Sequence, residues 1–487
     1  MFTGHSANYP GFILFFLLNF TLKVIHLADY PLAIDEPLST YFPLFDIGPL
    51  LKYFTTTQTA PLYDILMHFW LKITGVDSVF LLRLPSLIFN SLTAGLLFIG
   101  GIRFFNKEVG IGAASIFVVS NIQVHFAQEN RPYALFTLLS LLSLYYFLGY
   151  VQSLERVNAK KIFNSDFVIA VLLHSALVYT HYFGIFVLLI ELFACLTFRE
   201  ISRGKLQYWF LVCVGVGITF LPIAYYVARS FYATAVMGRW WLKAPETPEE
   251  VWYVLRQYTN SPWGTFAALT IIIAGYVCAT VKRIRLQISE KILLLFFPMA
   301  WLGMLLISYI TPIFLDRYTL YITPAFYILV ILNLQRLFFS TYIRYGLAAL
   351  LIGLFSFYTI PYFDRGWNVP RLIQKVNELK TPETVVYFCP GWFNINYIYY
   401  SDQDLFSKKL PTADLALELI RKTNLYSVNS KELVDEKIVS KAGQILYIDF
   451  NSELGLPKNG VLQKLRSLRE KSEEKFDFQE LSVYRLR

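Results

Sequence analysis

Eleven apolar runs in the first three quarters of the chain constrain this sequence more than any other feature. A helix needs roughly 17–25 mainly apolar residues to cross the hydrocarbon core of a bilayer. The runs lie near 11–28, 79–101, 109–124, 133–151, 166–180, 183–198, 208–228, 263–281, 292–310, 318–335 and 343–361. They predict an all-α polytopic membrane protein with about eleven transmembrane helices, the shortest of which could be tilted, re-entrant or merged.

Composition excludes several other classes of protein. The chain is 56% hydrophobic and 16% charged, whereas a soluble domain carries about 25% charged residues. The four cysteines show no CxxC spacing, which argues against disulfides or a cysteine metal site. The net charge of +9 is concentrated in short loops between apolar runs, a pattern of membrane topology and not of nucleic-acid binding. The sequence also lacks a glycine-rich phosphate loop of the kind that holds a nucleotide sugar.

The basic residues predict the orientation of the chain. Arginines and lysines gather in the loops near 103–107, 156–161, 199–205, 282–291 and 336–344. If the N-terminus is cytoplasmic, each of these loops is cytoplasmic as well, as the positive-inside rule requires. The loops 29–78 and 229–262 and the tail then lie outside. We read the first run as a retained helix because it lacks a small-residue cleavage site.

The tail differs in composition from the membrane part. It is charged, has an amphipathic stretch at 371–380 and helical periodicity near 413–422 and 461–470, and contains apolar β-type runs at 385–388 and 445–448. We therefore predict two domains: a transmembrane domain over 1–361 and a small soluble α/β domain outside the membrane over 362–487.

Two adjacent carboxylates, Asp35 and Glu36, follow the first apolar run. At a membrane surface, a carboxylate can act as the general base toward a hydroxyl or an amine. The alternative is that both are solvated loop charges or cap the next helix. The dipeptide alone does not decide between these interpretations.

Further segments give the pair a context, in a fixed order along the chain. They are Gln58–Tyr63, His68–Trp70, Arg83–Ser86, His125–Tyr133 and Asp316–Tyr318. Together with Ala33–Ser39, this set resembles the family 39 glycosyltransferases, relatives of the dolichyl-phosphate-mannose:protein mannosyltransferases and of the lipid A aminoarabinose transferases. The resemblance covers about 1–361 and is strongest over 33–150. It implies the GT-C fold, a polyprenyl-phosphate-linked sugar donor and transfer to an acceptor outside the cytoplasm.

The resemblance also implies roles for individual residues. Asp35 matches the catalytic base of an inverting transfer, and Glu36 would orient the acceptor or support Asp35. Positive charge suits the leaving phosphate, and an arginine offers it a bidentate fork. Arg131, Arg317 and Arg83 are the candidates, and snorkelling toward lipid headgroups is the alternative for each. The candidates for binding the donor or acceptor sugar are Glu129, His125, His181 and Tyr318, of which Glu129 could instead pair with an arginine and the histidines could be structural.

The predicted function is an inverting glycosyltransferase of the bacterial inner (plasma) membrane that modifies a lipid, a glycan or a protein. Carboxylates and histidines would permit a divalent metal, but no ligand spacing of the HExxH type supports one, so we expect neither metal nor other cofactor. A transporter or flippase of lipid-linked sugars is the alternative from another class. It would place ionisable groups deep within several helices, whereas the candidates here lie at helix ends. An inactive relative that only binds the donor is a third possibility.

Overall fold

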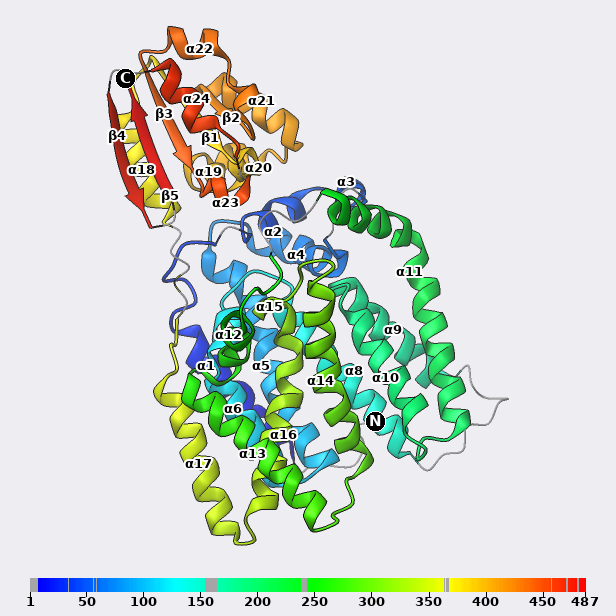
Figure 1. The fold of residues 1–487 in the computed structure, drawn as a ribbon. Coiled ribbons are helices and arrows are strands. Elements are labelled where there is room, and N and C mark those ends of the chain that lie inside the picture. Colours follow the sequence, from blue (N-terminus) through cyan, green and yellow to red (C-terminus); the bar gives the residue numbers. More distant parts are fainter. Residues whose placement is uncertain are drawn as a thin grey trace.

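A helical bundle carries a small sheet domain at one of its ends (Figure 1). The computed structural model describes residues 8–33, 35–55, 57, 59–153, 164–237, 243–362, 364, 368–456, 458–469, 472–479 and 481–487. We call the end of the bundle that faces the sheet the sheet-side end.

Each of the eleven apolar runs coincides with a helix or with consecutive helices of the described chain. Six helical segments are long and apolar enough to cross a membrane: α5 (Val79–Phe104), α8 (Tyr133–Gln152), α11 (Arg203–Met237), α13 (Pro262–Val281), α14 (Ile288–Ser308) and the segment of α15 (Asp316–Thr319), η4 (Leu320–Ile322) and α16 (Thr323–Leu337). Four apolar helices are shorter: α1 (Tyr9–Val24), α9 (Ser165–Thr180), α10 (Gly184–Thr197) and α17 (Thr341–Phe357). The chain is thus a multi-pass membrane protein, and the count of eleven spans depends on these four helices and on one bent helix pair.

The run expected at 109–124 is a bent pair and not one straight span. Helices α6 (Lys107–Val119) and α7 (Asn121–Ala127) meet at an angle of 64°. Ser120 between them is extended, and Asn260 satisfies the backbone that the break exposes. The Asn260 side chain donates to the Val119 carbonyl oxygen and accepts from the Asn121 N–H, both at 2.7 Å. These two hydrogen bonds offset the cost of exposing backbone polar groups at the break inside an apolar bundle.

The connections at the sheet-side end contain short helices. Between α1 and α5 lie α2 (Leu38–Tyr41), η2 (Phe42–Leu44), α3 (Ile47–Phe54) and α4 (Pro61–Thr74). Between α11 and α13 lies α12 (Pro248–Thr259), which starts at the Thr247–Pro248 pair with a threonine N-cap and proline at its first position.

A five-stranded mixed sheet forms the C-terminal domain, in the order β2-β1-β3-β5-β4. Its strands are β1 (Thr384–Cys389), β2 (Leu425–Ser427), β3 (Gln444–Asp449), β4 (Glu473–Phe478) and β5 (Leu481–Leu486). The first three are parallel, with Phe388 opposite Ile448, and the last two are antiparallel additions. Strands β1 and β3 are buried almost throughout, as their unbroken apolar runs require.

Short helices surround the sheet: α18 (Val369–Leu379), η5 (Gly391–Phe393), α19 (Asn394–Ser401), α20 (Gln403–Ser407), α21 (Thr412–Thr423), η6 (Lys431–Leu433), α22 (Glu436–Lys441), α23 (Ser452–Gly455) and α24 (Val461–Leu468). Helices α19, α20 and α23 lie on the side that faces the bundle (Figure 1). The small C-terminal α/β fold is therefore as predicted, with β1, β3, α18, α21 and α24 close to their expected positions.

Candidate active site

The predicted carboxylates and arginines meet at the sheet-side end of the bundle. Asp35 and Glu36 form a turn before α2, and Arg83 lies in the first turns of α5. Arg131 belongs to the short turn between α7 and α8, and Arg317 to α15. Four segments that are distant in sequence thus contribute to one cluster.

Asp35 lies between two guanidinium groups. Its carboxylate Oδ2 is 3.3 Å from Nη1 of Arg317, and 31% of its side chain is exposed. Nη1 of Arg131 lies 3.4 Å from the Asp35 backbone oxygen and donates to Ser39 Oγ at 2.8 Å. An accessible carboxylate is a group that can accept a proton from a substrate.

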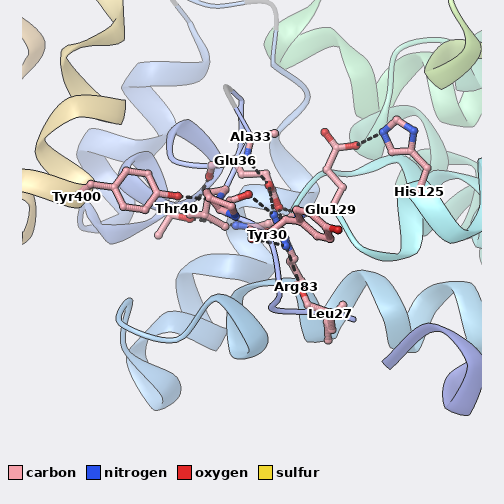
Figure 2. A network of polar contacts seen from close by, with 12 residues as sticks. Leu27, Tyr30, Ala33, Glu36, Thr40, Arg83, His125, Glu129 and Tyr400 are labelled. Atoms are coloured by element: carbon pink, nitrogen blue, oxygen red, sulfur yellow. Dashed lines mark hydrogen bonds and ion pairs between the residues drawn. The ribbon is translucent and has the colours of Figure 1, made fainter. Parts of the chain in front are cut away.

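Glu36 has a different environment. Its side chain is fully buried, and its carboxylate receives both Nε and Nη2 of Arg83 at 2.9 and 2.8 Å (Figure 2). The backbone N–H groups of Ala33 and Asn130 donate to it as well, each at 2.7 Å. Glu36 thereby joins its own loop to α5 and to the α7–α8 turn.

The structure corrects the role predicted for Arg83. Its five N–H groups are all engaged, because besides the two bonds to Glu36 it donates to the carbonyl oxygens of Leu27, Tyr30 and Pro31 at 2.9–3.1 Å. Arg83 is buried, and none of its donors is directed at a ligand. We therefore assign Arg83 to the ion pair with Glu36 and not to a contact with the donor phosphate. Glu36 is fully buried in the same pair.

Glu129 and His125 lie beside the arginines. Glu129 is buried, and its Oε2 is 3.9 Å from Nε2 of His125 (Figure 2). The His125 ring stacks on Phe126 with 4.2 Å between the centroids. Glu129 is also close enough to act electrostatically on both Arg131 and Arg317.

An aromatic wall completes the cluster. The His181 ring lies 5.4 Å from Tyr318 and 6.1 Å from Tyr133, measured between centroids. The Arg317 guanidinium is 5.3 Å from the Tyr318 ring, and that of Arg131 is 5.8 Å from the Tyr133 ring. Rings at these distances orient the two arginines through cation–π contact.

Sequence reasoning missed several residues of this cluster. Ser39 holds Arg131, and Asn130 links the loops because its side chain donates to Thr40 Oγ1 at 3.0 Å and accepts from Tyr63 Oη at 2.8 Å. A signal existed for Asn130, which stands between two predicted residues in the turn before Pro132. Ser39 ends the Ala33–Ser39 segment, but nothing in that pattern indicated its contact with an arginine.

Asp64, in the first turn of α4, was also missed, and it provides a pH test. It is 4% exposed, and burial raises its pKa to about 7 while Arg131 opposes the shift. Above that pH the protein holds a buried charge that the unfolded chain leaves in water. The free energy of unfolding therefore falls as the pH rises from about 4 to 7 and is level above. Tyr53 and Tyr63 also face this carboxyl.

We expect Asp64→Asn to raise the melting temperature at pH 8 and to leave it nearly unchanged at pH 4.5. The buried amide is itself polar, so the net gain at pH 8 is on the order of 1–2 kcal/mol, less than the full shift implies. Thermal unfolding in detergent at both pH values measures this. An equal change at both would show that Asp64 does not titrate in this window.

The described residues contain no group of three or more histidine, cysteine, aspartate or glutamate side chains arranged to hold a metal ion. The expectation of a metal-independent site remains a prediction.

Comparison with known proteins establishes the fold. No protein-family model and no curated protein matches the sequence. Among solved structures, ArnT from Cupriavidus metallidurans in the apo state is similar, with a TM-score of 0.59 and 11% identity. The alignment covers 99% of this chain and 98% of the ArnT chain. ArnT bound to undecaprenyl phosphate gives 0.57 and 10%, with the same coverage.

The archaeal oligosaccharyltransferase AglB from Archaeoglobus fulgidus, in complex with an inhibitory peptide and a dolichol-phosphate, is similar as well. It covers 92% of this chain and 70% of its own, with a TM-score of 0.51 and 10% identity. At these identities the similarity concerns the fold. The chain has the GT-C fold that its sequence motifs predicted.

Proposed function

We propose that this GT-C fold membrane protein is an inverting glycosyltransferase that takes a sugar from a polyprenyl-phosphate donor. The observation that carries the proposal is the accessible Asp35 carboxylate, 3.3 Å from Arg317 and on the loop that Arg131 contacts. A base next to two cations is what an inverting transfer from a phosphate requires.

The comparisons support the class of donor. Two proteins of the same fold have been solved in complex with lipid phosphates, undecaprenyl phosphate in ArnT and dolichol-phosphate in AglB. In this chain Arg131 and Arg317 are the cations available to such a phosphate. A planar guanidinium binds two phosphate oxygens at once, and the flanking rings hold each fork in place.

The reaction needs one base and no protein nucleophile. The acceptor hydroxyl or amine attacks C1 of the sugar as Asp35 removes its proton. The bond between C1 and the phosphate oxygen breaks, and the electron pair leaves with the polyprenyl phosphate. Arg131 and Arg317 stabilise the charge that this oxygen gains. The phosphate also competes with Asp35 for Arg317.

Our candidates for contact with sugar hydroxyl groups lie in the same cluster and are Glu129, His125, His181 and Tyr318. Buried carboxylates and aromatic faces suit a sugar, which offers hydroxyls at its rim and an apolar face. The acceptor is a lipid, a glycan or a protein, and the residues of the cluster do not favour one of these.

The flippase alternative finds less support. Lys23 and Glu191 are two of the charged groups that lie buried in the described part of the bundle, and each has a polar partner there. Lys23 donates to Asn19 and Asn90 at 2.6 and 2.9 Å, and Glu191 lies 2.9 Å from His174. Lys23 belongs to α1 and Glu191 to α10, and their hydrogen-bond partners are different residues, whereas a transporter collects such groups near the bilayer midplane.

We place the site on the non-cytoplasmic side of the bacterial inner membrane. The basic loops that join α13 to α14 and α16 to α17 lie at the end of the bundle opposite the sheet (Figure 1). Under the positive-inside rule that end is cytoplasmic, and the sheet domain and Asp35 face the periplasm or the cell exterior.

A transfer assay tests the proposal. The protein is reconstituted in proteoliposomes that contain a panel of radiolabelled polyprenyl-phosphate sugars, with and without crude lipid, glycan and protein acceptors. We expect transfer, or slow hydrolysis of one donor without an acceptor. If every donor stays intact but moves between leaflets, the transferase proposal is wrong and the flippase replaces it.

The arginines give a second prediction. We expect Arg317→Gln to lower kcat/KM by about 10²-fold and to weaken the binding of undecaprenyl phosphate, because one charge-stabilising group is lost from the leaving oxygen. Arg317→Lys should recover part of this. Arg371→Gln, an exposed arginine at the start of α18, is the control. Unchanged phosphate binding in Arg317→Gln would remove this residue from the donor site.

A further inference from the structure

The sheet domain contacts the loops that form the site through three tyrosine hydroxyls. Tyr400 of α19 accepts a hydrogen bond from the backbone N–H of Leu32 at 2.6 Å. Tyr399 donates to the Val76 carbonyl oxygen at 3.1 Å. In the other direction, Tyr41 of α2 donates to the carbonyl oxygen of Leu410 at 2.6 Å.

One apolar core lies behind these bonds. Leu32, Tyr41 and Tyr63 from the bundle side belong to the same buried cluster as Phe388 and Phe406 from the sheet domain. The rings of Tyr41 and Phe406 meet edge to face at 5.1 Å. Domains joined by a tether alone move freely, whereas a shared apolar core fixes their relative position.

Tyr400 accepts its hydrogen bond from Leu32, which lies three residues before the proposed base Asp35. Leu32 is 1% exposed, so its N–H has no access to water as a substitute partner. The next N–H, that of Ala33, donates to Glu36. Leu32 and Ala33 are therefore held from the sheet domain by Tyr400 and from the bundle by the Glu36–Arg83 pair (Figure 2).

We infer that the sheet domain is part of the catalytic apparatus, in which Tyr400 is a positioning residue that sets the place of Asp35 through the Leu32 backbone. The inference rests on the proposed transferase function. Removal of the Tyr400 hydroxyl leaves a buried N–H without a partner, which the loop relieves by moving. A displacement of about 1 Å in a reacting group can cost about 10²-fold in rate.

Tyr400→Phe tests the inference in the full-length protein. We expect kcat to fall by about 10- to 100-fold while KM for the donor stays within about twofold, since the arginines are on other elements. Tyr397→Phe is the matched control. It removes a hydroxyl from the same helix, where the ring packs on Phe388 and no hydrogen bond of this hydroxyl is found in the described chain.

Hydrogen exchange adds a readout that does not need activity. The Leu32 amide should exchange faster in Tyr400→Phe than in wild type. In Tyr397→Phe its exchange rate should equal that of the wild type. If Tyr400→Phe does not fold, Tyr41→Phe, which removes the bond to Leu410, tests in the transfer assay whether contact with the sheet domain affects kcat.

The outcomes separate the inference from the function. No transfer by the wild type with any donor would overturn the proposed function. The exchange of the Leu32 amide would still report whether Tyr400 holds this backbone. Transfer by the wild type with an unchanged Tyr400→Phe, or with equal losses in Tyr400→Phe and Tyr397→Phe, would overturn the inference alone. A raised donor KM with intact kcat would also overturn it, because the domain would then serve donor binding.

Discussion

Asp35→Asn should lower the rate of sugar transfer by about 10³-fold and leave donor binding intact. The amide has the shape of the carboxylate but cannot take a proton from the acceptor, and a general base contributes about 10²- to 10⁴-fold. The substitution also removes the partner of one Arg317 donor, 3.3 Å away. Arg317 then binds phosphate without competition, so we expect the Kd for undecaprenyl phosphate to stay equal or to fall.

The measurement is single-turnover transfer together with a separate binding assay. Asp29→Asn is a matched control, because Asp29 is an exposed carboxylate near the same loop and pairs with His26. A variant that binds the lipid phosphate normally and still transfers sugar at the wild-type rate would show that another group is the base.

The fold of the variant should persist. The pair of Asp35 and Arg317 is partly exposed, and such ion pairs contribute about 1 kcal/mol or less. A large loss of thermal stability in Asp35→Asn would therefore also contradict the assignment, because it would indicate a structural carboxylate.

Apolar length predicted the spans because a bilayer-crossing helix must satisfy its backbone within itself and cover itself with apolar side chains. Both requirements are local in sequence. The break between α6 and α7 is not local, since it depends on Asn260, about 140 residues further along the chain. The 109–124 run therefore looked like one short span.

The sheet was predictable only in its buried centre. Strands β1 and β3 are continuous apolar runs, whereas β4 at the edge carries charged residues and is largely exposed. Strand β2, at the opposite edge, is three residues long. Its place in the sheet comes from pairing with Val386–Phe388 and not from its own pattern.

The site divides in the same way. The motifs indicated Asp35, Arg131 and Arg317, and the structure brings these three together. Arg83 also lies near a helix start, which is all that sequence position reveals, but its partner is Glu36, 47 residues away. Whether an arginine faces a ligand or a buried carboxylate depends on such distant contacts. For the same reason, the sequence described a separate tail and gave no sign of the bond from Leu32 to Tyr400.

Glu36→Gln should destabilise the protein by about 3–5 kcal/mol, the usual cost of leaving one member of a buried ion pair without its partner. The charge of Arg83 would remain buried against three carbonyl oxygens, which do not neutralise it. The Ala33 and Asn130 N–H groups would also lose their anionic acceptor. We expect a much lower yield of folded protein and a lower melting temperature, in contrast to Asp35→Asn one position earlier.

A double-mutant cycle separates the pair from the general cost of substitution. Arg83→Gln should destabilise by a similar amount, because it leaves the Glu36 carboxylate buried without the guanidinium that neutralises it. The double variant Glu36→Gln/Arg83→Gln should lose less than the sum of the single losses, since neither charge is then stranded. Additive losses would mean that the two side chains act independently. A stable Glu36→Gln that binds donor but does not transfer sugar would restore Glu36 as a reacting group and leave the support of the loop to Tyr400.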